Sequence, residues 1–186
     1  RFLIFDYCGN FEYFRQKQNG YEVKETKSLT ENIFSKRIRI AMNLQEAAYS
    51  DTKYQQWRSE LVDTCRKQIC TLNPELIEVR LQRQFVEKFQ KPDALECIGE
   101  GDKGELIGKI APIVRSQEYA KRFDNFMYGL ILSHMEQMPS FRSAKKQLQN
   151  MAALLEKKAN VPKVKEKITL IREIGSETFW EANDIL

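Results

Sequence analysis

The side chains that most often carry out chemistry are scarce in this sequence of 186 residues. His134 is the only histidine, and the cysteines Cys8, Cys65, Cys70 and Cys97 form no CxxC pair. A metal site needs converging Cys, His or carboxylate ligands, and a Cys–His nucleophile needs a base beside the thiol. We therefore predict no catalytic residue, no metal ligand and no bound cofactor here. His134, on the apolar face of a predicted helix, is interpreted as a packed core histidine.

One glycine-rich stretch has some features of a phosphate-binding loop. Gly104 and Gly108 are followed by Lys109, but the glycines are one residue too close for the usual spacing. Ile110 replaces the hydroxyl residue that would hold magnesium, and no predicted strand precedes the segment. We interpret Gly104–Lys109 as a plain loop.

A group of lysines in the last third of the chain could contact DNA. A row of lysines can neutralise phosphates without reading base sequence. Glu156 and Glu166 interrupt the group, and solvated helix faces often have this composition. Contact with the DNA backbone and a solvated face both remain open. The lysines are Lys145, Lys146, Lys157, Lys158, Lys163, Lys165 and Lys167.

The elements that would position these residues are predicted to be helices. Apolar side chains recur at helical spacing over residues 28–48, 54–72, 74–89, 116–134, 140–155 and 162–174. Ser28 followed by Glu31 forms a capping box, Asn73 and Ser140 are predicted N-caps, and Pro162 suits a first helical turn. Residues 93–115, interrupted by several glycines, are expected to form at most a short helix around Leu106 and Ile110 and to be mobile or loop-rich. The pattern predicts an all-α bundle of about six or seven helices.

The N-terminal segment is different, because it has the pattern of a strand. Phe2, Leu3, Ile4 and Phe5 form a continuous apolar run typical of a strand buried on both faces. No other stretch predicts a partner strand, so we expect the rest of its sheet to lie upstream of Arg1. The predicted division is residues 1–27, the end of an upstream lobe with its linker, and residues 28–186, a helical domain.

Two segments carry a resemblance to a known family. The run Phe5–Phe14, FDYCGNFEYF, closely resembles the segment that follows the last helicase motif in the motor (R) subunit of type I restriction enzymes. The segment from Val161 through Ile171 to Phe179 and Trp180 is similar to the C-terminal part of the same subunit. Between these anchors the likeness is a pattern of helices.

The resemblance implies a parent chain that hydrolyses ATP with magnesium, translocates double-stranded DNA and cleaves it. The ATP-binding, helicase and nuclease motifs have no matching positions in this chain. Pro92-Asp93 and Glu156-Lys157-Lys158 spell the letters of the nuclease motif, but we reject the match because they fall at a helix end and on a helix surface. The fragment is therefore expected to be non-catalytic.

Docking is the role that the resemblance suggests for the fragment. Its expected partners are the modification (methyltransferase) and specificity subunits, with DNA reached through the complex, and Phe179 and Trp180 are candidate docking residues. Two alternatives remain. One is a helical module that guides DNA beside the motor, and the other is the helical tail of another DNA helicase.

Composition limits which other classes of function the sequence can indicate. The net charge of +4 is too small to indicate nucleic-acid binding by itself, and the hydrophobic content of 42% is typical of a globular chain. No apolar run approaches the ~20 residues needed to cross a membrane, so a membrane role is not expected. Unpaired cysteines and the resemblance together predict a cytoplasmic location.

Overall fold

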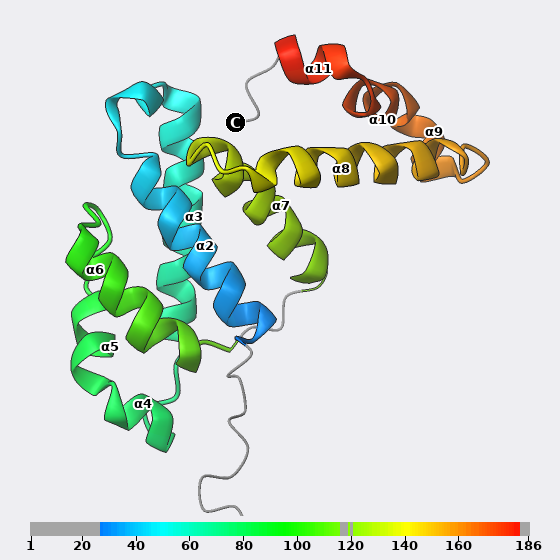
Figure 1. Ribbon diagram of the computed structural model, residues 1–186. Helices are drawn as coiled ribbons and strands as arrows, with labels where there is room; N and C mark the ends of the chain where they lie inside the picture. The colour runs from blue at the N-terminus through cyan, green and yellow to red at the C-terminus, as the bar shows by residue number, and fades with distance from the viewer. Residues whose placement is uncertain (1–26, 116–118, 120, 183–186) are drawn as a thin grey trace, which may run out of the picture.

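Helix α2 (Leu29–Asn43) lies at the centre of the body and packs against α3 (Thr52–Cys70), α6 (Glu100–Glu105) and α7 (Lys121–Met135). In the computed structural model, residues 27–115, 119 and 121–182 are described (Figure 1). Within these ranges the chain forms ten α-helices and no strand, which confirms the all-α prediction. The strand predicted at the N-terminus and the predicted boundary at residue 27 depend on residues outside the described ranges.

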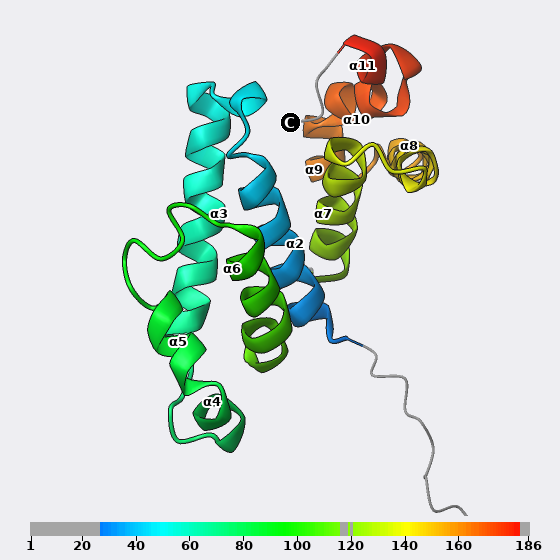
Figure 2. The same ribbon diagram turned by 60° about the vertical axis from the view of Figure 1, so that its left-hand side comes forward.

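The start of α2 follows from its cap. The Ser28 hydroxyl oxygen accepts a hydrogen bond from the backbone N–H of Glu31 at 3.1 Å, as the sequence predicted. The apolar side chains of α2 face two neighbours, so the helix is buried on opposite sides. Figure 2 shows α3 (Thr52–Cys70) on one side of α2 and α7 (Lys121–Met135) on the other.

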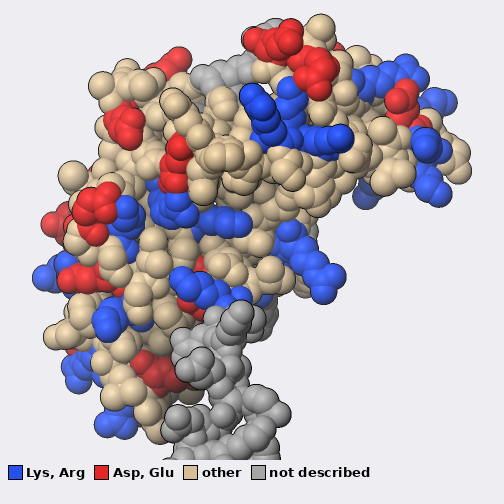
Figure 3. Space-filling view, viewed as in Figure 1, with Lys and Arg blue, Asp and Glu red and all other residues tan. Residues whose placement is uncertain are grey.

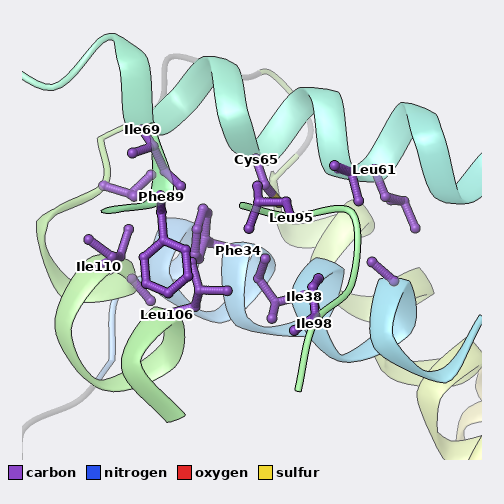
Figure 4. Close-up of a cluster of buried hydrophobic side chains, with 14 of the residues drawn as sticks. Phe34, Ile38, Leu61, Cys65, Ile69, Phe89, Leu95, Ile98, Leu106 and Ile110 are labelled. Carbon is purple, nitrogen blue, oxygen red and sulfur yellow. The ribbon is translucent and has the colours of Figure 1, made fainter. Parts of the chain in front are cut away.

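The main core lies between α2, α3 and the segment that follows α5 (Figure 4). Phe34 and Ile38 of α2 and Ile69 of α3 are completely buried there. Phe89 enters the same core at the end of α5 (Arg83–Phe89). Burying side chains of this size stabilises a fold by about 1.5–3 kcal/mol each.

The helix predicted over residues 74–89 is interrupted. Asn73 Oδ1 accepts a hydrogen bond from the N–H of Glu75 at 2.9 Å, but the helix itself, α4, begins only at Ile77 and ends at Leu81. Gln82, with φ −107° and ψ 16°, separates α4 from α5. The predicted helix count of six or seven was too low, because breaks of this kind divide long stripes into short helices.

Residues 93–115 pack into the core and are helical from Glu100 to Ile113, so the prediction of at most a short helix around Leu106 and Ile110 was wrong. They contain α6 (Glu100–Glu105), a π-helical turn η2 (Leu106–Ile110) and a short 3-10 turn η3 (Ala111–Ile113). Leu95, Leu106 and Ile110 are completely buried. The glycines of this segment are exposed, and burial of these three apolar side chains offsets the entropic cost of glycine in a helix. Gly104–Lys109 is accordingly helical, and its prediction as a plain loop was also wrong.

Arginine and glutamine side chains fix the stretch before α6 to the body. Arg58 of α3 donates to the backbone carbonyl of Glu96 at 2.6 Å and to that of Ala41 at 3.0 Å. Gln45 donates to the carbonyl of Ile98 at 3.0 Å and accepts from its N–H at 2.7 Å. The irregular backbone therefore has partners that no helix supplies.

The C-terminal helices form an arm that projects from this body (Figure 1). The arm consists of α8 (Ser140–Glu156), α9 (Pro162–Glu166), α10 (Ile168–Gly175) and α11 (Glu177–Ala182). Pro139 is the N-cap of α8, so Ser140 is its first residue and not its cap. With 17 residues α8 is about 25 Å long. Lys167 divides the helix predicted over residues 162–174 into α9 and α10, and α10 returns along α8.

Candidate interaction surface on the helical arm

The arm carries an open groove with apolar walls. Its volume is about 560 Å³, and it lies between α8, α10 and the first turn of α7. Phe123 and Leu154 are 51% and 62% exposed in its walls, so water contacts apolar surface there. The residues lining the groove are Phe123, Leu148, Met151, Ala152, Leu154, Leu155, Lys158, Ile171 and Ile174. We call this feature the apolar groove.

The groove exists because α8 has more apolar surface than its neighbours cover. Ala152 is the only fully buried residue of α8, and Leu148 and Met151 are half-buried. The end of α10 lies close to α8 at this point, since a Cβ placed on Gly175 would be in ordinary contact with the Ala152 Cβ at 3.9 Å. α10 lies along this part of α8 but leaves Leu154 and Leu155 62% and 46% exposed.

Phe179 and Trp180, the predicted docking residues, are half-buried against the arm itself. The Trp180 Nε1–H donates to the backbone carbonyl of Ile174 at 2.8 Å. The Trp180 ring also meets the rings of Phe179 and Phe141, with centroids 5.7 and 6.4 Å apart. These contacts hold α11 on α8 and α10, so much of both side chains is used inside the chain. Their role in docking stays a prediction.

Lys145 is likewise engaged within the arm. Its Nζ lies 2.5 Å from Glu177 Oε2 and 5.7 Å from the centre of the Trp180 ring. Gln149 donates to the other carboxylate oxygen of Glu177 at 3.0 Å. The hydrogen bond from Lys145, followed by that from Gln149, lowers the pKa of Glu177 below its ordinary value. Of the seven candidate DNA contacts, Lys145 is the one whose charge is already balanced.

The other six predicted lysines are exposed, and in the described part of the chain none forms an ion pair. Five of them, Lys157, Lys158, Lys163, Lys165 and Lys167, lie where α8 passes into α9 and α10, and we call them the lysine tip. Figure 3 shows Lys and Arg gathered at this far end of the arm. Glu156 Oε1 lies 2.7 Å from Arg172 Nε, so the charge of Glu156 is paired. Glu166 is then the carboxylate that lies among the tip lysines.

His134 lies at a second cavity, of about 660 Å³, where α7 ends and α8 begins. Its ring centroid is 5.1 Å from that of Phe141, so the histidine is packed against an aromatic ring and is half-buried. Arg142 and Tyr49 also line this cavity, but no carboxylate does among the described residues.

The letters of the nuclease motif are not brought together. Arg66 of α3 donates to the Pro92 carbonyl at 2.6 Å, which places that segment on the body. Glu156 ends α8 on the arm. Within the described ranges, no group of three or more His, Cys, Asp or Glu side chains is placed to hold a metal ion. No described helix has the length and apolar character needed to span a membrane.

The groove residues were not predicted as a site from the sequence. Leu148, Met151 and Leu155 belong to the stripe that predicted α8, and that stripe alone does not distinguish a buried face from an open one. Leu154 was the feature of the sequence that could have indicated an open apolar face. Because it lies next to Leu155, it widens the apolar face of the helix beyond what a single neighbouring helix covers.

Comparisons with known proteins do not extend this description. No protein-family model, no curated protein and no solved structure matches the chain.

Proposed function

We propose that this chain is a non-catalytic helical module from the C-terminal region of a type I restriction enzyme R subunit. It docks the motor onto the modification and specificity subunits. ATP hydrolysis with magnesium, DNA translocation and DNA cleavage belong to other parts of the parent chain. The resemblance at Phe5–Phe14 and at Val161–Trp180 supports the family in this proposal.

The apolar groove is the observation that supports docking over other roles. Apolar surface is stabilised by removal from water, and rimmed apolar patches on folded proteins commonly mark protein interfaces. A helical arm that projects from the body offers this surface to a partner without rearrangement of the core (Figure 1).

A module that guides DNA is the second candidate, and the lysine tip favours it. Lysines without ion-pair partners among the described residues can neutralise backbone phosphates, and such binding weakens steeply as salt rises. Docking through apolar surface is much less sensitive to salt.

A pull-down at low and high salt tests the proposal. The cognate modification and specificity subunits are one bait, and a short DNA duplex is the other. We expect the protein subunits to be retained at both salt concentrations, and the Leu154→Asp variant to lose them.

Leu81→Asp is the matched control, because Leu81 is 74% exposed on α4 and lies outside the groove. It should retain the subunits as the unchanged chain does. Retention of DNA alone, lost at high salt and on changing the tip lysines to Gln, would replace docking with DNA guiding.

A further inference from the structure

The apolar groove has the dimensions of a binding site for a helix. Its lining residues run from Leu148 of α8 to Lys158, two residues beyond the end of that helix, which corresponds to about 15 Å, or about three helical turns. Apart from Lys158, whose stem is aliphatic, every lining residue is apolar. A helix of that length presents apolar side chains at i, i+3, i+4 and i+7 to such a groove.

An extended segment fits less well. Strand addition requires a row of unpaired backbone N–H and C=O groups, and the walls of this groove are helices whose backbone groups bond along the helix axis. Only side chains are therefore available for recognition. This favours an occupant whose own backbone is already hydrogen-bonded, that is, a helix.

The groove is positively charged at one end. Lys158 follows Leu155 by three residues, and its N–H donates to the Leu155 carbonyl at 2.8 Å. Lys167 precedes Ile171 by four residues, and its carbonyl accepts from the Ile171 N–H at 2.9 Å. Lys158 lines the groove, and Lys167 stands about one helical turn before the lining residue Ile171.

Little negative charge balances that end. Residues 157–167 contain five lysines and one acidic residue, Glu166. Glu156, just before them, is paired with Arg172. A partner that fills the apolar walls and carries carboxylates at this end would satisfy both features, because charge complementarity fixes the orientation of docking.

The geometry points to an acidic amphipathic α-helix of about three turns as the occupant of the apolar groove, its carboxylates lying against the lysine tip. The assignment rests on the proposed function, since the helix would belong to the modification or specificity subunit. DNA does not satisfy the same features, because phosphates match the lysines but leave the apolar walls in contact with water.

Peptide binding tests the chemistry of the occupant. Three synthetic helices are titrated with the chain: one with a leucine face flanked by glutamates, one with lysines in place of the glutamates, and one with serines in place of the leucines. We expect the acidic leucine helix to bind at least about tenfold more tightly than either of the others. Equal binding of the acidic and basic helices, or of the leucine and serine helices, would overturn the assignment.

Variants of the chain locate the site. Leu154→Ser and Leu154→Asp should each weaken the acidic helix about tenfold or more, and Lys158→Gln with Lys167→Gln should remove most of the salt dependence. Leu81→Asp should change neither the affinity for the acidic helix nor its salt dependence. Leu154→Ser is included because it introduces no charge, and its far-ultraviolet circular dichroism verifies the fold. Unchanged affinity in both Leu154 variants would place the helix elsewhere.

Cross-linking in the assembled complex separates this inference from the proposed function. A photoreactive phenylalanine derivative replaces Leu154, and the linked segment is identified by mass spectrometry. We expect a helical segment of a partner subunit with an excess of Asp and Glu. Retained subunits with a link to a basic or neutral segment would overturn the inference and leave docking intact, whereas absence of the subunits would reject docking itself.

Discussion

Lys36 of α2 donates hydrogen bonds to both oxygen atoms of Asn125 on α7, at 2.6 Å to the backbone carbonyl and 2.7 Å to Oδ1. Burial is the main cause that lowers the pKa of Lys36, and the nearby Arg39 lowers it further. Because α7 leads directly into α8, this contact connects the body to the helix that carries the arm.

Replacing Lys36 with Met should destabilise the fold by about 1–2 kcal/mol. Met retains the aliphatic stem but leaves both Asn125 oxygens without their charged donor, and such bonds are worth about 1.5–3 kcal/mol when buried, less when partly exposed. Urea denaturation measures the change. Lys67→Met is the control, because Lys67 is exposed on α3 and should shift stability by less than about 0.5 kcal/mol. Equal effects of the two substitutions would contradict the importance of this contact.

Gly129 and Lys36 should be energetically coupled. A Cβ on Gly129 would lie 3.1 Å from Lys36 Nζ, closer than most real contacts of a Cβ. Ala is favoured over Gly inside a helix by about 1 kcal/mol, so Gly129→Ala should stabilise a Lys36→Ala variant by about that amount. In the unchanged chain the displaced ammonium should cancel the gain. Thermal unfolding of the two single variants and the double variant measures the coupling, and strict additivity would contradict it.

How much of this fold could be predicted depends on the residue. Ser28 and Pro162 are local signals, and each lies at the start of a helix, as the sequence predicted. Ile77 and Leu81 misled the prediction, because they continue the four-residue spacing of Phe85 and Phe89 yet are 73% and 74% exposed. The break at Gln82 turns α4 so that Val79 is buried instead, and this depends on tertiary packing that spacing does not encode.

The candidate site was predicted only in part. The lysines were visible in the sequence, but the pairing of Lys145 with Glu177, 32 residues away, depends on how α11 folds back. Phe179 and Trp180 were singled out because they lie near the end of the sequence, in the segment that resembles the C-terminal part of the family. Their contacts with Phe141 and the Ile174 carbonyl likewise require the folded arm.

The thiols should differ sharply in reactivity. Cys65 is buried in α3, whereas Cys70 and Cys97 are exposed. In a Cys8→Ser background, we expect two thiols to react rapidly with a disulfide reagent under native conditions. Cys65 should react at least about 100-fold more slowly, because a buried thiol is reached only through local or global opening. Adding urea should bring the third thiol to the rate of the others. Three equally fast thiols in the native chain would contradict the burial of Cys65.

Acid should release α11 from the arm through Glu177. The hydrogen bonds from Lys145 and Gln149 place the folded pKa of Glu177 below its ordinary value of 4.5. A carboxyl group with a lowered folded pKa stabilises the folded form fully above its unfolded pKa and loses that contribution as the pH falls through the folded pKa. The docking of α11 should therefore weaken below about pH 4.5 and persist at neutral pH.

Trp180 reports this step by its fluorescence once Trp57, the other tryptophan, is replaced by Phe. Glu177→Gln should remove the acid transition of Trp180, since the amide does not titrate. An identical transition in the Gln variant would assign it to other carboxylates and would contradict the role of the Lys145–Glu177 pair.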